Sequence, residues 1–373
     1  MTQRDVVGAI PRRTLEDCPA EICELIFTYA CVDDGSLGRS LSLVSRYIKD
    51  VSRTTRYQSV SISGLDEMLS LNTILEGSPP EYRKVRNLFI QIRFPRKQTV
   101  KPAKKSGMVV RFFRRKFFAR RGDPPTSAVP PAGPPEDAGD PTSQTASSDG
   151  LCLAMQTFCA VEILSQVAST LRTLTVVMPY SRKYPLAPVP LPHLTELTLY
   201  GSCGTHAFWD FANAHSLPSL QRLHLAGGYG SSAQIAECLQ FAPSLTHLRF
   251  TSPEPGDALS SCAQGVLLFA NRSARPQDQD TPAPQLTRVV IQPMCTPSFI
   301  SQYSEGLTAF SIAMEMMGGG IDGISVPFLR NGVILSPQLW HGHTDSLAIT
   351  AKGYWLSRND GGLGCWDEVD RVV

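Results

Sequence analysis

The stretch LTELTL at residues 194–199 recurs along the chain and decides the fold class. The same frame, Leu-x-x-Leu-x-Leu with Val, Phe or Ile substituting, begins again at residues 171, 220, 245 and 286, and VRNLFI at residue 85 is an earlier copy. The copies from 171 to 245 start 23, 26 and 25 residues apart, and the last starts 41 residues further on. A period of about 20–29 residues is typical of leucine-rich repeats, and each short alternating apolar string predicts a β-strand.

Helical patterns lie between these strings. They cover residues 64–77, 158–169, 206–215, 232–241 and 257–273. Alternating strands and helices at this spacing predict an α/β fold, an irregular leucine-rich-repeat-like solenoid with a parallel sheet on its concave side. Further on, residues 305–319 and 344–358 have amphipathic helical patterns, and residues 323–335 are strand-like. Repeat arrays need a terminal cap, so we expect Trp355 and Trp366 to close the open end of the array.

The frame also predicts which side chains leave the core. Its fourth and sixth positions point inward, so the third and fifth positions face the concave surface. In the later copies these outward positions carry five basic or histidine side chains: Arg222, His224, His247, Arg249 and Arg288. Two interpretations stay open, a merely solvated sheet face or a substrate-binding strip for an acidic or phosphorylated segment, since Arg binds phosphate in a bidentate manner.

The stretch CPAEICELIFTYA at residues 18–30 predicts a short helix near the N-terminus. Pro19 suits the first helical turn, and Glu21 is favourable at a helix N-terminus. The apolar side chains of Ile22, Leu25, Ile26, Tyr29 and Ala30 recur at i, i+3, i+4, i+7 and i+8, which gives one continuous face.

A second amphipathic helix is expected within GRSLSLVSRYIKDVSR, residues 38–53. Its apolar positions are Leu41, Val44, Tyr47, Ile48 and Val51. Two or three short helices form only a marginal core by themselves. The apolar face of the first helix is therefore expected to pack either against the following domain or against another protein.

These residues resemble a known family. The runs Cys18-Pro19-Ala20-Glu21-Ile22, Leu25-Ile26-Phe27, Leu41 and Val44-Ser45-Arg46-Tyr47 resemble the F-box pattern, although Cys18 stands where Leu is usual and Tyr47 where Trp is common. The longer stretch from residue 30 to 64, with the tail GGLGCW at 361–366, is similar to the F-box-like proteins abundant in mushroom-forming basidiomycete fungi.

The resemblance implies a function by docking. F-box modules bind a Skp-type adaptor, which links them to a cullin–RING ubiquitin ligase, and leucine-rich repeats that follow an F-box often present the substrate surface. The residues that would line the adaptor-binding face are Pro19, Glu21, Ile22, Leu25, Ile26, Leu41 and Val44. The implied partners are the adaptor, the ligase and an unknown protein substrate.

Basic residues are concentrated in one part of the chain. Residues 83–121 hold 15 of the 35 Lys and Arg and no Asp or Glu, which leaves 20 basic against 33 acidic residues elsewhere, a net charge of −13. Residues 122–150 come next, with seven prolines and no Lys or Arg. We expect 93–150 to be a disordered insertion that loops out of the solenoid.

The end of the basic part, RFFRRKFFARR, interleaves Phe with Lys and Arg. It fits a solvated loop, a nuclear-import signal, a membrane-surface helix or a nucleic-acid contact with stacked Phe rings. Its charged residues are Arg111, Arg114, Arg115, Lys116, Arg120 and Arg121. The predicted organisation is thus a flexible N-terminus (1–12), an F-box-like helical module (13–60), a first repeat (61–92), the insertion (93–150) and the remaining solenoid with its cap (151–373).

Motifs for catalysis are not evident. The chain lacks a Gly-rich phosphate loop, a G-x-S-x-G nucleophile motif and a Cys-x-x-Cys pair, so we expect neither an enzyme nor a metal or cofactor site. Without a long apolar run or an apolar leader, we expect no membrane span and a cytoplasmic or nuclear location. Two alternatives remain, a repeat-type interaction scaffold without a ligase role and, more weakly, a nucleic-acid-associated protein acting through the basic insertion.

Overall fold

The computed structural model describes residues 15–93, 142–178, 189–201, 217–227, 242–251, 288–292, 333–335 and 344–369. Several predicted features lie outside these ranges: residues 1–12, the basic segment after Arg93, and the helices expected at 206–215, 232–241, 257–273 and 305–319. The chain forms two compact units, residues 1–93 with 153–373, and residues 94–152. The strands and helices of the described ranges belong to the first unit, apart from the start of one helix at residues 142–152.

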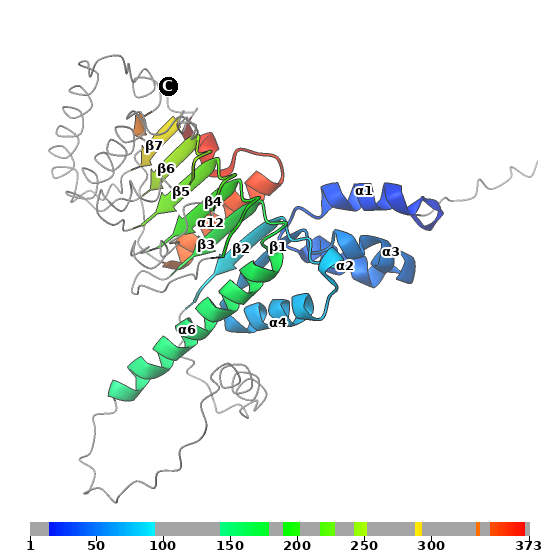
Figure 1. Cartoon of the computed structure of the whole chain (residues 1–373), viewed down its shortest axis with the longest axis horizontal. Coiled ribbons are helices and arrows are strands. Elements are labelled where there is room, and N and C mark those ends of the chain that lie inside the picture. The colour runs from blue at the N-terminus through cyan, green and yellow to red at the C-terminus, as the bar shows by residue number, and fades with distance from the viewer. Residues whose placement is uncertain are drawn as a thin grey trace, which may run out of the picture. The chain divides into compact units, whose positions relative to one another are not determined.

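Eight parallel strands form one sheet, and they lie side by side in chain order (Figure 1). They are β1 (Ser59–Ser63), β2 (Asn87–Gln91), β3 (Thr173–Val177), β4 (Glu196–Tyr200), β5 (Arg222–Ala226), β6 (His247–Thr251), β7 (Arg288–Gln292) and β8 (Val333–Leu335). Every neighbouring pair is parallel. The predicted α/β class and parallel sheet are confirmed.

The repeat frame also predicted the register correctly. Strands β2 to β7 each begin at the third position of the frame, and these first residues are paired across the sheet. In order they are Asn87, Thr173, Glu196, Arg222, His247 and Arg288. Strand β1 was not predicted, and the expected module boundary at residue 60 falls inside it. Its SVSIS alternation is short, and only Val60 and Ile62 signal a strand.

One face of the sheet is covered by helices that precede or follow a strand. The second and fourth residues of the strands, such as Leu88, Ile90 and Val176, are fully buried. Helix α4 (Gly64–Glu76) packs against β1. Helix α6 (Thr142–Val167) is joined to α4 by a hydrogen bond in which Gln166 Nε2 donates to Asn72 Oδ1 at 2.7 Å.

Helix α6 begins earlier than expected. The prediction of an unfolded linker up to residue 150 is wrong for residues 142–150, which are helical. Once the buried part of α6 has formed, extending the helix toward its N-terminus requires no new nucleus.

Within α6, residues 150–167 are long and apolar enough to span a membrane by length and hydropathy, and 44% of this stretch is buried inside the protein.

Before β1, the described residues form three short helices, α1 (Ala20–Ala30), α2 (Ser36–Val44) and α3 (Arg46–Val51), with 3-10 turns at Leu15–Asp17 and Ser52–Thr54. A further 3-10 turn, Pro80–Tyr82, lies between α4 and β2. The expected single helix over 38–53 is therefore wrong. Ser45 has an extended backbone, φ −156° and ψ 170°, and its hydroxyl accepts a hydrogen bond from Ile48 N at 3.3 Å. Serine favours this N-cap geometry, so it ends one helix and begins the next.

The last described elements are helix α12 (Thr344–Asn359) and the 3-10 helix η5 (Gly364–Val369). Helix α12 lies against β2 and β3. The expected capping role of Trp355 and Trp366 is wrong, because both side chains are buried on the face of the sheet, at 3% and 2% exposed. Trp355 packs on Phe89 of β2, and Trp366 on His224 and His247 of β5 and β6.

Candidate docking site

Helix α1 has two apolar faces, and the residues that the structure describes cover only one of them. Cys23 and Phe27 are buried and form a small core with Cys31 and Ile48. The opposite side, which we call the outer face of α1, consists of Ile22, Leu25, Ile26 and Tyr29, which are 47%, 53%, 45% and 76% exposed. Of the two alternatives that the sequence left open, packing of this face against the following domain is not seen among the described residues.

Polar contacts along its flank hold α1 in place. Glu24 Oε1 accepts a hydrogen bond from Thr54 Oγ1 at 2.6 Å, and Gln58 Nε2 donates to the Thr28 carbonyl at 3.0 Å. At the start of the helix, the Tyr47 hydroxyl donates to the Cys18 carbonyl at 2.6 Å. The outer face is therefore presented on a helix that is fixed from its inner side and along its length.

The chemistry of the outer face suits a protein partner. Three aliphatic side chains and a tyrosine ring offer contact area but no nucleophile or metal ligand. Burying the exposed half of each aliphatic side chain would contribute about 1 kcal/mol. Contiguous exposed apolar side chains on one helix face mark interaction sites, and aromatic residues such as Tyr29 often dominate binding energy there.

The other predicted adaptor-binding residues differ in their surroundings. Pro19 and Glu21 are exposed at the start of α1. Leu41 is partly buried and packs against the core below α1. Val44 is 65% exposed at the end of α2, and its neighbour Leu43, which the repeat of apolar positions did not single out, is 85% exposed. Leu43 lies outside the helical spacing of the expected inward-facing residues. This was the only indication in the sequence that its side chain would be exposed.

The predicted substrate strip lies on one face of the sheet, as the frame indicated, but it is not open. His224 and Arg249 are 1% and 2% exposed, so the expectation of a solvent-facing strip is wrong for these residues. Helix α12 and η5 lie over part of this face: Ala351 and Trp355 join a cluster with Tyr200 and Ala226, and the Trp366 ring lies beside His224. Arg222 keeps a quarter of its side chain exposed. Strand β7 carries Arg288 beside His247, with its side chain outside the described residues.

Glu196 connects this cover to the sheet. Its carboxylate accepts a hydrogen bond from Arg358 Nε at 2.7 Å and one from Trp366 Nε1 at 3.4 Å, and Arg222 lies 3.6 Å away on β5. Nearby, His224 Nε2 lies 2.8 Å from Thr251 Oγ1. Burial, with the charge of Arg249 adding to it, lowers the pKa of His224 well below its usual value, so this imidazole is neutral at physiological pH.

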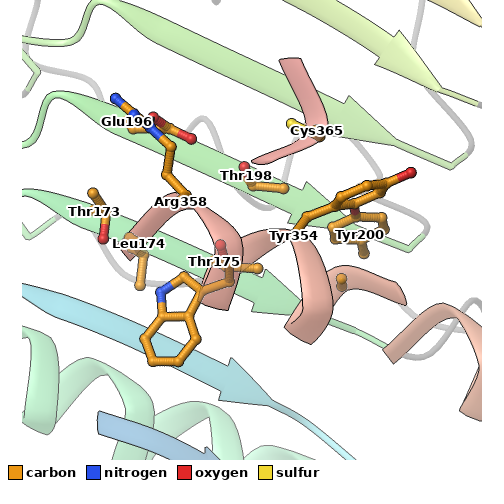
Figure 2. Close-up of a pocket in the computed structure, with 11 residues that line it drawn as sticks. Thr173, Leu174, Thr175, Glu196, Thr198, Tyr200, Tyr354, Arg358 and Cys365 are labelled. Atoms are coloured by element: carbon orange, nitrogen blue, oxygen red, sulfur yellow. Dashed lines mark hydrogen bonds and ion pairs between the residues drawn. The ribbon is translucent and has the colours of Figure 1, made fainter. Parts of the chain in front are cut away.

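The space between α12 and the sheet is too small for a ligand. Figure 2 shows Arg358 pointing toward Glu196 at this space, which Tyr354 and Tyr200 also line. Its volume is about 10 Å³, roughly the space of one water molecule. It is a packing gap under the cover rather than a small-molecule site.

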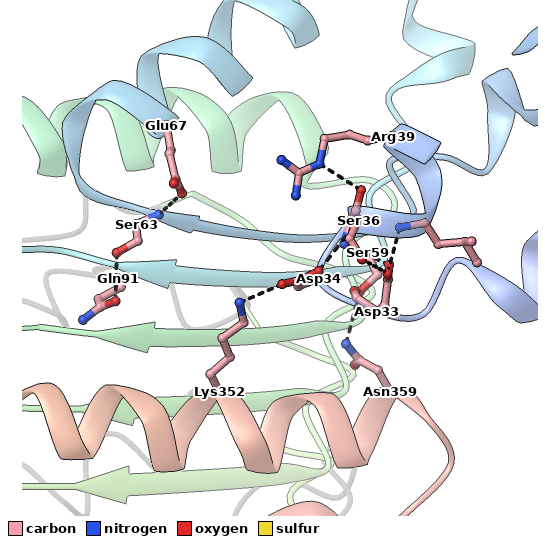
Figure 3. Close-up of polar contacts among 12 residues, drawn as sticks. Asp33, Asp34, Ser36, Arg39, Ser59, Ser63, Glu67, Gln91, Lys352 and Asn359 are labelled. Carbon is pink, nitrogen blue, oxygen red and sulfur yellow. Dashed lines mark hydrogen bonds and ion pairs between the residues drawn. The ribbon is translucent and has the colours of Figure 1, made fainter. Parts of the chain in front are cut away.

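The cover also contacts the loop between α1 and α2 and the start of β1 (Figure 3). Lys352 Nζ lies 2.8 Å from Asp34 Oδ2, and Asn359 Nδ2 donates to Ser59 Oγ at 3.2 Å. Next to Asp34, the Asp33 carboxylate accepts from Leu37 N at 2.8 Å and from the Ser36 hydroxyl at the start of α2. The hydrogen bond from Lys352 lowers the pKa of Asp34 below its usual value.

The remaining predicted contacts lie in the basic segment, outside what the structure describes. Within the described ranges, no group of His, Cys, Asp and Glu side chains could hold a metal ion. The possible nuclear-import or nucleic-acid contacts, Arg111, Arg114, Arg115, Lys116, Arg120 and Arg121, lie outside the described residues.

Comparisons with known proteins add no relative from which a function could be carried over. No family model, no curated protein and no solved structure matches this chain. The function of this chain is therefore inferred from its residues and its geometry alone.

Proposed function

We propose that this chain is an F-box-like substrate-recognition subunit. In this proposal the outer face of α1 docks on a Skp-type adaptor of a cullin–RING ubiquitin ligase, and the leucine-rich-repeat-like solenoid binds a protein substrate. The observation that supports docking most directly is the exposure of Ile22, Leu25, Ile26 and Tyr29 on a helix whose opposite side is already packed.

The residue pattern adds support to this geometry. The Pro19-to-Phe27 run resembles the F-box signature, and its apolar members that face outward are those the resemblance assigns to the adaptor. Exposed Val44 and Leu43 at the end of α2 add apolar surface outside α1. A helix presenting i, i+3, i+4 and i+7 side chains is a common way for one protein to fit the groove of another.

The test is co-purification of the full chain with a fungal Skp-type adaptor. Leu25→Asp combined with Ile26→Asp should abolish the complex, because charged groups would be buried without partners in the interface. The thermal midpoint should change little, since both side chains are about half exposed. Ile74→Asp, on α4 and 40% exposed, is the matched control and should still bind.

The competing function is an interaction scaffold without a ligase role. It predicts no adaptor complex with the unchanged chain, or a complex that survives the double Asp variant. Either result would contradict the ligase proposal. The exposed face of α1 would then be a docking site for a protein other than the adaptor.

A further inference from the structure

Basic side chains form a stripe on the surface beside the short N-terminal helices. The stripe starts on α3 and the 3-10 turn that follows it, passes the turn at Pro80–Tyr82, and ends where β2 and β3 begin. We call this set the basic stripe, and its members are Arg46, Lys49, Arg53, Lys84, Arg86 and Arg172. The Arg86 side chain is partly buried, and the other side chains of the stripe are exposed.

The helical part of the basic stripe follows from the spacing of its residues. Arg46, Lys49 and Arg53 lie at i, i+3 and i+7, which places them on one side of α3 and its 3-10 continuation. Ile48 and Ser52 lie on the side that packs inward, and both are buried. Packing of that side therefore leaves the three cations facing solvent.

A ring contact links the helical part of the stripe to the sheet. The Arg53 guanidinium lies over the Tyr82 ring, 4.4 Å from the ring centroid. Lys84 and Arg86 follow along the chain, one on each side of Val85, which is fully buried. Because Val85 fills the inward position of this segment, its two basic neighbours are left at the surface.

The protein itself does not neutralise the basic stripe. Arg172 N donates to the Arg86 carbonyl at 2.8 Å, so these two arginines stand side by side at the starts of β2 and β3. Among the residues that the structure describes, no member of the stripe forms an ion pair. Two exposed carboxylates, Asp50 and Glu81, lie along it in sequence, which leaves an excess of positive charge. Residues 15–35, which include α1, instead hold six Asp or Glu and no Lys or Arg.

The chemistry of the basic stripe favours an anionic ligand, because guanidinium groups bind carboxylates and phosphates in a bidentate manner. Two observations favour an acidic protein segment over a nucleic acid. Arg53 already covers a face of the Tyr82 ring, whereas single-stranded nucleic acids depend on open aromatic rings for stacking. Asp50 and Glu81 interrupt the stripe, so a regularly charged phosphate backbone would meet both carboxylates.

We propose that the basic stripe binds an acidic segment of a partner protein, through ion pairs between the carboxylates of that segment and the exposed cations. The stripe begins directly after Leu43 and Val44, which are exposed at the end of α2. A polar rim beside an apolar patch is the usual arrangement of a protein interface, and complementary charges there speed association and give selectivity. The stripe contains no side chain of the outer face of α1, so this inference does not depend on docking to an adaptor.

Cross-linking to Lys49 and Lys84 tests the inference on the full chain. The probe is an acetylated hexaglutamate peptide, and a water-soluble carbodiimide couples its carboxylates to lysine amines that they contact. Mass spectrometry of the digested protein then gives the yield at each lysine. Both lysines should be cross-linked, and the yields should fall steeply when the ionic strength is raised from about 0.05 M to about 0.5 M, because salt screens exposed charges.

Two charge-matched variants separate the stripe from the general charge of the chain. Arg53→Gln with Arg172→Gln removes two cations of the stripe, and Arg39→Gln with Arg93→Gln removes two exposed cations outside it. The first variant should lower the yields at the two lysines of the stripe about threefold, the loss expected for two weak surface ion pairs. The second should leave these yields unchanged. Both variants should keep the thermal midpoint of the unchanged chain, because the substituted side chains are exposed.

Three results would overturn the inference. Equal losses in the two variants would show that the peptide responds only to the net charge of the chain. Absence of cross-links at both lysines of the stripe would show that an acidic segment does not bind there. An oligothymidylate of equal charge, added at the concentration of the peptide, should at most halve the yields, and a larger suppression would show that the stripe prefers a nucleic-acid backbone.

Discussion

Glu196 joins the C-terminal segment to the sheet. Its side chain is 10% exposed and interacts with Arg358, Trp366 and Arg222, which come from three different elements. Glu196→Gln keeps the shape but removes the charge, and hydrogen bonds to charged groups contribute about 1.5–3 kcal/mol. We expect the free energy of unfolding, measured with urea, to fall by about that amount.

The control for this prediction is Glu81→Gln, an exposed carboxyl in the turn at Pro80–Tyr82. Surface substitutions of this kind change stability by about 0.5 kcal/mol or less. Equal, small effects of the two substitutions would show that Glu196 does not hold the cover to the sheet.

The Asp34–Lys352 pair predicts a pH dependence. Because the hydrogen bond from Lys352 lowers the folded-state pKa of Asp34, the pair stabilises the protein above the unfolded-state pKa, and this stabilisation is lost as the pH falls through the folded-state pKa. Both side chains are about one-third exposed, so the effect should be about 0.2–1 kcal/mol.

Urea unfolding of the unchanged chain and of Lys352→Ala measures this effect. The difference in stability should be present near neutral pH and should be lost as the pH falls through the lowered folded-state pKa of Asp34. Lys84→Ala, at an exposed position, serves as the control and should show no such pH-dependent difference. A difference for Lys352→Ala that stays constant down to the acid range would contradict the assigned pairing.

At the scale of elements, two glycines within helices should respond to alanine in opposite ways. In α2, a Cβ on Gly38 would lie 2.1 Å from the Arg56 carbonyl oxygen and 2.8 Å from its carbon, and these backbone atoms cannot rotate away. In α12, a Cβ on Gly353 would meet nothing within 4 Å.

Gly38→Ala should therefore lower the free energy of unfolding by about 1–2 kcal/mol, because overpacking outweighs the gain in helix propensity. Gly353→Ala should slow exchange of the α12 amides with solvent, because the gain in propensity is not opposed. Amide hydrogen exchange and urea unfolding measure the two effects. Stabilisation by Gly38→Ala would mean that α2 does not pack closely on the segment around Arg56.

The elements that the sequence predicted best are those with a strict local pattern. The frame located β2 to β7 and their register, since every strand carries its apolar side chains at the same two positions. The patterns at 64–77 and 344–358 also located α4 and α12. The break between α2 and α3 was missed because the apolar spacing continues across Ser45, while the capping hydrogen bond that interrupts the helix depends on one hydroxyl.

At the scale of the whole molecule, the same periodicity located two surfaces but did not show how either one is covered. The apolar spacing located the outer face of α1, whereas its exposure was one of two alternatives that the sequence left open. The cover over the strip at His224 and Arg249 could not be predicted, because it comes from α12 and η5, far along the chain from these strands. No local pattern of the strands indicates which distant segment lies on them.

The C-terminal segment also links regions that are far apart in sequence. Its helix contacts the loop between α1 and α2 at Asp34, β1 at Ser59 and β4 at Glu196. The contact at Asp34 links the loop between α1 and α2 to the C-terminal segment. In the proposed function, these contacts would fix the direction in which a substrate is presented relative to the adaptor.

The most direct test of the proposed docking is amide hydrogen exchange on the full chain with and without a Skp-type adaptor. We expect slower exchange on binding within Ala20–Ala30, which carries the outer face of α1, and at the end of α2 near Val44, with β3 to β5 unchanged. Absence of a complex, or protection that leaves Ala20–Ala30 unaffected, would contradict the proposal.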